Sequence, residues 1–99
     1  MPIRGIVRHE AVTIGNSATA MTITASNGNL PEAALIEVED AAIRFRADGS
    51  DPTSTTGHNA EVGEIIELVS KDEVQKFRAI RRDGVDATLR ITQGIEFFA

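Results

Sequence analysis

Residues 43–58 read IRFRADGSDPTSTTGH, and within them an alternating pattern gives way to a run of turn-forming residues. Ile43, Phe45 and Ala47 are apolar, and Arg44 and Arg46 stand between them. Successive side chains of a β-strand point to opposite faces of the sheet, so this alternation is typical of a half-buried strand. The first part of the stretch therefore predicts a strand with one face in a core and the other in water.

The second part of the stretch predicts a rigid corner. Asp48-Gly49 is a strong turn pair, because Gly accepts a positive φ and the Asp side chain bonds its own backbone. Pro52 disfavours a helical conformation at Asp51 and has no N–H to donate to a neighbouring strand. We therefore predict a structural turn at Asp48, Gly49, Asp51 and Pro52.

The same alternation recurs along the rest of the chain. It is clearest in AALIEVED (33–40) and ATLRIT (87–92), and weaker in GIVRHEAVTI (5–14), ATAMTITA (18–25), EIIELVS (64–70) and QKFRAIRR (75–82). Turn-forming residues separate these segments, among them 70–73, and only LPEAAL (30–35) predicts as much as one helical turn. The chain is therefore predicted to be all-β: a single immunoglobulin-like antiparallel β-sandwich of about seven strands over residues 1–99.

The composition counts against several classes of function. The 99 residues include 10 Lys and Arg against 15 Asp and Glu, a formal net charge of −5, which argues against nucleic acid as a partner. The chain has no cysteine, which excludes disulfides and thiolate metal sites. No apolar run is long enough for a signal peptide or a membrane span, which predicts a product made in the cytoplasm with no membrane partner.

The corner is also a candidate calcium site, because Asp48, Ser50 and Asp51 offer three oxygen ligands. Calcium is usually held by about six to eight oxygens, with further carboxylates among them. The next carboxylate along the chain is Glu61, ten residues after Asp51. The turn interpretation is therefore favoured, and we predict neither a metal nor a cofactor.

Residue types that carry catalysis in other proteins show no catalytic pattern in this sequence. His9 and His58 lie far apart, which is a weak spacing for a pair of metal ligands. The hydroxyl groups near the corner have no nucleophile elbow or identifiable base, and we expect them to bond the loop backbone: Ser50, Thr53, Ser54, Thr55 and Thr56. The chain is therefore predicted not to be an enzyme and to have no catalytic residue.

One pair of carboxylates has the separation that catalysis requires. Glu37 and Glu39 point the same way from one predicted strand, about 7 Å apart by strand rise, and glycosidases use such separations. Arg44 and Arg46 are predicted to face the same way on a neighbouring strand. Cross-strand ion pairs on a solvated face are therefore the favoured interpretation.

The end of the sequence, GIEFFA (94–99), concentrates apolar side chains in Ile95, Phe97 and Phe98. These residues are candidates for an interface, since a concentrated apolar patch often marks one. The alternative is that they form the last strand of the core. All four aromatic residues of the chain are Phe, and the lack of Trp and Tyr counts against a sugar-binding surface.

Two resemblances follow from these segments. IRFRADGSDPTS (43–54) with the later FRAIRRDG (77–84) resembles a strand, corner and strand of the immunoglobulin-like domain at the C-terminus of chitobiase-type glycosidases, where the corner is structural. A longer resemblance covers ATAMTITA (18–25), ALIEVEDAAIRFRADGSDPTSTTGH (34–58), GEIIELVS (63–70) and FRAIRRDGVDATLRIT (77–92). Over these segments the chain is similar to small proteins encoded among the head and tail genes of tailed bacteriophages.

The longer resemblance implies a non-enzymatic component of the virion, made in the host cytoplasm. The favoured hypothesis is a capsid decoration or cement protein that binds the major capsid protein or other virion subunits. By analogy with decoration proteins, the resemblance implies a homo-oligomer, such as a trimer. The alternatives are an accessory structural protein of the tail or head–tail junction, a carbohydrate-binding accessory module, and a phage-encoded regulatory protein made during infection.

Overall fold

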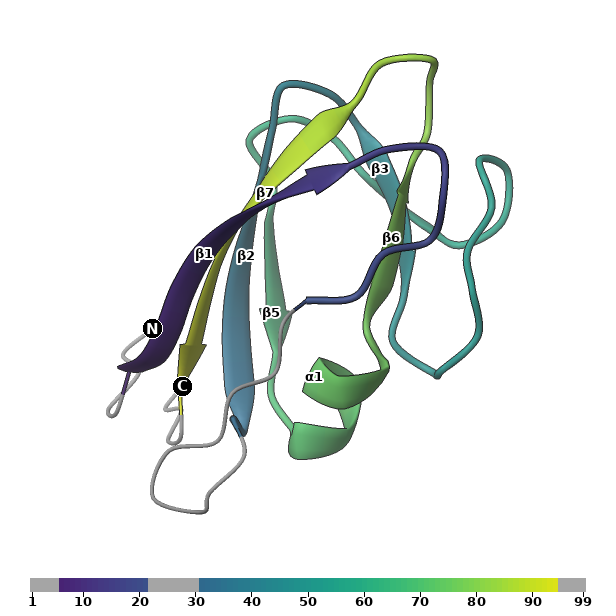
Figure 1. Ribbon diagram of the computed structural model, residues 1–99. Coiled ribbons are helices and arrows are strands. Elements are labelled where there is room, and N and C mark those ends of the chain that lie inside the picture. Colours follow the sequence, from purple (N-terminus) through teal and green to yellow (C-terminus); the bar gives the residue numbers. More distant parts are fainter. Residues whose placement is uncertain (1–5, 22–30, 95–99) are drawn as a thin grey trace.

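The computed structural model describes residues 6–21 and 31–94, which form a small all-β sandwich, as the alternation predicts (Figure 1). In these residues the elements are β1 (Ile6–Ile14), β2 (Ala33–Glu39), β3 (Ile43–Arg46), β4 (His58–Ala60), β5 (Ile65–Leu68), α1 (Lys71–Lys76), β6 (Arg78–Arg81) and β7 (Ala87–Gly94). The strands form two antiparallel sheets of order β1-β7-β2-β5 and β4-β3-β6. These residues contain seven strands, the number predicted, although β4 was not among the predicted segments and the predicted segment 18–25 is not one of the seven.

The strand order differs from that of a constant-type immunoglobulin domain at two strands. In that fold the fourth strand belongs to the sheet of the first strand, and the seventh strand belongs to the other sheet. Here these two strands have exchanged sheets, because β4 pairs with β3 and β7 lies between β1 and β2. β7, the last strand of the described residues, is therefore an inner strand of its sheet and joins β1 to β2.

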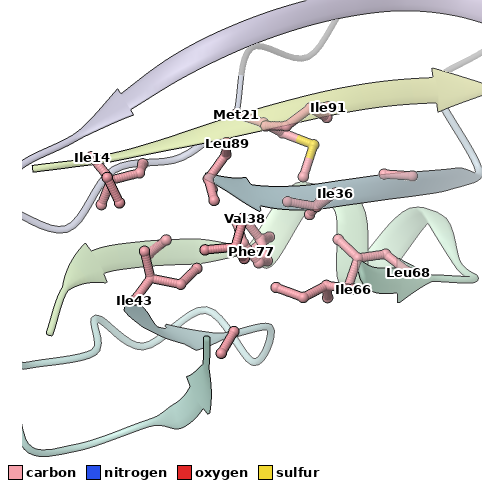
Figure 2. Packing of buried hydrophobic residues seen from close by; sticks show 14 of the residues in the cluster. Ile14, Met21, Ile36, Val38, Ile43, Ile66, Leu68, Phe77, Leu89 and Ile91 are labelled. Carbon is pink, nitrogen blue, oxygen red and sulfur yellow. The ribbon is translucent and has the colours of Figure 1, made fainter. Parts of the chain in front are cut away.

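One apolar cluster fills the space between the two sheets (Figure 2). Ile36 and Val38 of β2 and Leu89 and Ile91 of β7 are all at most 1% exposed, so the alternation predicted for these strands is confirmed. Phe77, between α1 and β6, is also 1% exposed and is the largest of the fully buried side chains. The burial of these side chains holds the two sheets together.

A corner after β2 moves the chain from the four-stranded sheet to the three-stranded sheet. Asp40 has a φ of +71°, a left-handed conformation that Asp tolerates better than most residues. The Ala41 N–H donates to the Glu39 carbonyl at 2.8 Å and tightens the turn. β3 consequently begins at Ile43 in the other sheet rather than beside β2.

The predicted ion pairs between the Glu residues of β2 and the Arg residues of β3 are therefore wrong, because the two strands are not neighbours in one sheet. Glu39 instead pairs with Arg90 of the adjacent strand β7, and the Arg90 Nε lies 3.2 Å from a Glu39 carboxylate oxygen. Glu37 is opposite Arg90 in register and Ile65 on its other side.

The short helix α1 corrects the prediction that residues 70–73 are only turn-forming and that a strand begins at residue 75. The Ser70 side chain accepts a hydrogen bond from the Glu73 N–H at 3.2 Å, and the Glu73 carboxylate accepts one from the Val69 N–H at 2.9 Å. These bonds satisfy N–H groups at the start of the helix, in the manner of a capping box. Val74 then points into the core, where it is 1% exposed.

We expect Ser70→Ala to lower the free energy of unfolding by about 1 kcal/mol, because it removes the side-chain cap of α1. Urea denaturation followed by circular dichroism measures this change. Ser54→Ala is the matched control, since Ser54 uses its backbone carbonyl rather than its side chain in its contact with Arg44. Equal stability of the two variants would contradict the capping role of Ser70.

The segment after β1 returns along the edge of the three-stranded sheet. Thr19 and Ala79 of β6 exchange two backbone hydrogen bonds, at 2.8 and 2.9 Å. The predicted strand over 18–25 is thus represented by one bridge in the described residues, and its remainder from residue 22 lies outside them. No helix within residues 6–21 and 31–94 is long and apolar enough to cross a membrane.

Candidate functional site

The corner after β3 has the geometry of a tight structural turn. Gly49 has a φ of +88°, and the Asp48 carboxylate accepts a hydrogen bond from the Ser50 N–H at 3.2 Å. Arg46 donates to both oxygens of the same carboxylate, from Nε at 3.1 Å and from Nη2 at 2.5 Å. The hydrogen bond from Arg46, followed by that from Ser50, holds the pKa of Asp48 below its ordinary value.

The loop beyond the corner closes on itself through the Thr53 to Thr56 turn. The Thr53 and Thr56 backbones exchange hydrogen bonds at 2.9 and 3.2 Å, and the Thr53 hydroxyl accepts bonds from the N–H groups of Thr55 and Thr56. The Thr53 hydroxyl therefore bonds the loop backbone. Pro52 is buried beneath the loop, and Asp51 is exposed.

We expect Gly49→Val to lower the free energy of unfolding by about 1–3 kcal/mol, because a β-branched residue resists a positive φ. The nearest atoms to an added Cβ belong to the flexible Lys76 side chain at 3.7 Å, so the loss comes from the backbone rather than from a clash. A thermal melt of the variant measures the effect. An unchanged melting temperature would show that the corner tolerates the strain.

In the described residues no three side chains from His, Asp and Glu gather at one place as metal ligands. We therefore expect a chelator to leave the melting temperature unchanged. Calorimetry with and without EDTA checks this expectation. A fall of more than a few degrees would indicate that Asp48 and Asp51 hold a cation and would overturn the turn interpretation.

A groove of about 670 Å³ opens between β5 and the corner loop, on the side of the sandwich where β4 and β5 are the outermost strands. Its apolar lining includes Phe45, Ile66 and Leu68. The Phe45 ring lies 5.4 Å from the ring of His58 and 5.7 Å from that of Phe77, measured between centroids. The groove also includes four charged residues: Arg46, Asp48, Glu67 and Glu73.

Apolar side chains are also exposed along the strand that borders this groove. Val62, Ile65 and Val69 are 57%, 56% and 62% exposed. Ile65 begins β5, Val69 directly follows that strand, and Val62 lies in the turn three residues before it. The fourth large exposed apolar residue of the described chain is Val85, between β6 and β7. Exposed apolar side chains of this size, gathered at one sheet edge, are typical of an interface.

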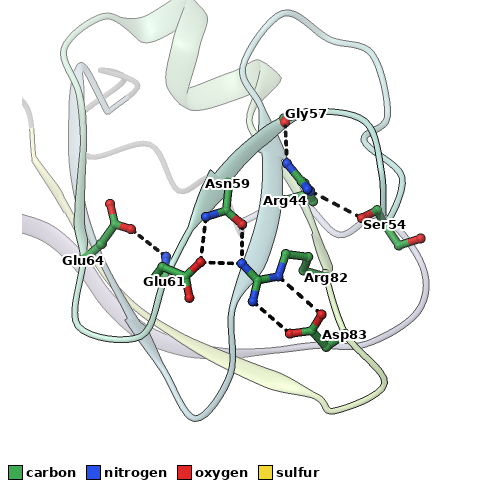
Figure 3. Close-up of polar contacts among 8 residues, drawn as sticks. All are labelled: Arg44, Ser54, Gly57, Asn59, Glu61, Glu64, Arg82 and Asp83. Carbon is green, nitrogen blue, oxygen red and sulfur yellow. Dashed lines mark hydrogen bonds and ion pairs between the residues drawn. The ribbon is translucent and has the colours of Figure 1, made fainter.

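An Arg-centred polar cluster covers the other side of the three-stranded sheet (Figure 3). Arg82 donates to Asn59 at 2.6 Å and to Asp83 at 3.0 and 3.3 Å, and it forms an ion pair with Glu61. The Asp83 hydrogen bond, followed by that to Glu61, raises the pKa of Arg82 above its ordinary value. This cluster ties the end of β6 to β4.

A second arginine fixes the loop that leads into β4. Arg44 donates to the Ser54 carbonyl and to the Gly57 carbonyl, both at 3.3 Å (Figure 3). The two bonds hold the corner loop against β3. The two arginines thus have structural partners, and Arg44 does not reach the Glu residues expected from the sequence.

The other residues considered for chemistry lie apart from one another. His9 bonds the Thr92 hydroxyl at 2.8 Å on the four-stranded sheet, while His58 packs against Phe45 on the three-stranded sheet. Ile95, Phe97 and Phe98 lie outside the described residues.

Sequence reasoning missed the groove and the exposed edge of β5. A signal for the edge was present in EIIELVS (64–70), where Ile65 and Ile66 are adjacent and break the alternation. Two consecutive apolar residues of a strand face opposite sides of the sheet, so one of the pair is directed away from the core.

No protein-family model, curated protein or solved structure matches the chain.

Proposed function

We propose that this chain is a non-enzymatic structural subunit of a bacteriophage virion, and in particular a decoration or cement protein of the capsid. The observation that carries the proposal is the edge of β5 with which no strand of residues 6–21 and 31–94 pairs, where Ile65 and Val69 are exposed beside a groove lined partly by apolar side chains. A strand edge with apolar side chains is a site for pairing with another chain. The protein therefore acts by occupying a position in an assembly.

The phage context of the proposal comes from the resemblance of residues 18–92 to small proteins of phage head and tail gene clusters. A decoration protein needs no catalytic group. It needs a rigid body and surfaces that fit neighbouring subunits. The apolar core between the two sheets makes the body rigid, and the β5 edge with its groove provides a surface for a neighbouring subunit.

The proposed mechanism is mass action. A subunit that binds the assembled capsid lattice, and does not bind its dissociated components, lowers the free energy of the assembled state. The stabilisation grows with the concentration of the free decoration protein relative to its dissociation constant. The chain would in this way make the head more resistant to heat without any chemical step.

Sedimentation with assembled particles tests this function. Heads prepared without the chain are mixed with the purified protein, pelleted, and heated to find the temperature at which they break open. We expect the chain to pellet with the heads and to raise that temperature. A chain that stays in the supernatant at every concentration would contradict the proposed function.

A further inference from the structure

The side of β5 that faces away from β2 carries backbone groups for a further strand. The Val38 N–H of β2 donates to the Glu64 carbonyl at 3.1 Å, just before β5 begins. Residues of an antiparallel strand alternate in the direction of their backbone bonds, so Ile66 is directed toward β2, while Ile65 and Glu67 are directed away from it. In residues 6–21 and 31–94 no strand pairs with that second side.

A strand added along this side would meet different side chains on its two faces. Toward the core it would meet the groove, which includes Ile66 and Leu68, 9% and 3% exposed. On the other face it would lie beside Ile65 and Glu67, which are both exposed and share that outer face because they are two residues apart.

The outer face beside this edge is acidic. Glu37 of β2 is opposite Ile65 in register, and residues directly opposite share a face, so the carboxylates of Glu37 and Glu67 lie on the same side of the sheet. Both side chains are exposed, and neither has an ion-pair partner among residues 6–21 and 31–94. Arg90 of β7, which is opposite Glu37, pairs with Glu39 instead. The edge therefore carries negative charge that a basic strand would complement.

We propose that the β5 edge accepts an extended, basic segment of a neighbouring virion subunit as an additional antiparallel strand. Strand addition to a sheet edge draws its affinity from backbone bonds and its selectivity from alternate side chains. All strand pairs in the described residues are antiparallel. This inference rests on the proposed function, and it gives the chemistry of the partner at the contact.

The geometry assigns a residue type to each face of the partner strand. Residues of an antiparallel pair that exchange backbone bonds are directly opposite and share a face. The partner residues that bond Ile65 and Glu67 therefore lie on the outer face, where Lys or Arg would neutralise the carboxylates of Glu67 and Glu37. The partner residues between them face the groove, and we expect them to be apolar because Ile66 and Leu68 line it.

The same charges disfavour β5 of a second copy as the added strand. The register that matches both outward-directed residues places Ile65 of each copy opposite Glu67 of the other. The two Glu67 side chains are then diagonal neighbours, within reach of each other. Both carboxylates lack a cation among the described residues, so they would repel each other.

Fluorescence anisotropy with labelled peptides tests the inference on the full chain. The probe is Thr-Val-Lys-Val-Lys-Val-Thr, and its control has Glu in place of each Lys. N-methylation of the Lys residues removes the N–H groups that would bond β5, whereas N-methylation of the Val residues removes those on the far side of the peptide. Glu67→Lys reverses the charge of the edge. Asp51→Lys is its matched control, because Asp51 is also exposed and does not line the groove.

We expect the lysine peptide to bind the full chain and Asp51→Lys equally, and Glu67→Lys at least about threefold more weakly. The glutamate peptide should show the opposite preference, with tighter binding to Glu67→Lys than to the full chain. Methylation at Lys should weaken binding about tenfold, and methylation at Val should leave it unchanged. Circular dichroism checks that both variants fold, and the methylated peptides test the contact without any change to the protein.

Equal binding of the lysine peptide to folded Glu67→Lys and Asp51→Lys, or equal effects of the two methylations, would overturn the inference. So would a full chain that excludes the peptide, whether a second copy, which sedimentation would detect, or another part of the same chain covers β5. Either result from a chain that still pellets with heads would overturn the inference alone. A chain that binds the peptide as expected and ignores heads would overturn the proposed function alone.

Discussion

Phe77→Ala is expected to lower the free energy of unfolding by about 3–5 kcal/mol, the range for removing a buried aromatic ring. The Phe77 side chain is 1% exposed and stacks at 5.7 Å on the ring of Phe45. It stands where α1 ends and β6 begins, so its removal leaves a cavity between the two sheets that the short connection cannot close. Urea denaturation followed by circular dichroism measures the loss.

Phe45→Ala is the matched control for this prediction, because Phe45 is a partner in the same stack but is only half-buried. We expect it to cost less than Phe77→Ala, since less apolar surface returns to water. A loss of under 1 kcal/mol for Phe77→Ala would mean that Phe77 does not join the two sheets.

Gly57→Ala is expected to lower the free energy of unfolding by roughly 2–4 kcal/mol, from backbone strain and crowding together. Gly57 has a φ of +126°, and an added Cβ would lie 3.0 Å from the Phe45 carbonyl oxygen and 3.2 Å from the Pro52 Cβ. Neither neighbour has room to move, because Phe45 belongs to β3 and Pro52 is buried under the corner loop.

Gly63→Ala distinguishes the effect of backbone strain from the effect of crowding. Gly63 has a φ of +90°, but nothing lies within 4 Å of its added Cβ, so this variant suffers strain without crowding. Chemical denaturation of both variants under the same conditions gives the comparison. The larger loss should belong to Gly57→Ala, and equal losses would show that the corner loop is not packed against β3 as described.

The strands were predictable because their burial repeats with period two. Ile36 and Val38 alternate with Glu37 and Glu39, and the two apolar residues are fully buried. A local pattern of this kind needs no knowledge of which strands are neighbours. The alternating pattern therefore identified β2 as a strand, but it did not show which strands pair with β2.

The arrangement of the strands was not predictable to the same degree, since it depends on single residues with unusual conformations. Asp40 turns the chain into the other sheet through a φ of +71°, and nothing in the pattern EVEDAAIR (37–44) distinguishes this from a hairpin within one sheet. The helix α1 was missed although Ser70 and Glu73 have the spacing of a capping box. At six residues, the helix is too short to show a 3.6-residue period.

The candidate site was predictable only in its corner. The turn chemistry of Asp48 and Gly49 is local, and the sequence shows it directly. The groove arises where β5 and the corner loop come together, and these are separate segments of the chain. Only the adjacent pair Ile65 and Ile66 carried a signal for the open edge.

Mass spectrometry of purified virions tests whether the chain is a structural component of the particle. Virions of the phage proposed to encode the chain are purified through two density gradients, and their peptides are compared with those of the infected-cell lysate. We expect peptides of this chain in the particles, at a constant ratio to the major capsid protein in both gradients. A chain abundant in the lysate and absent from the particles would contradict it.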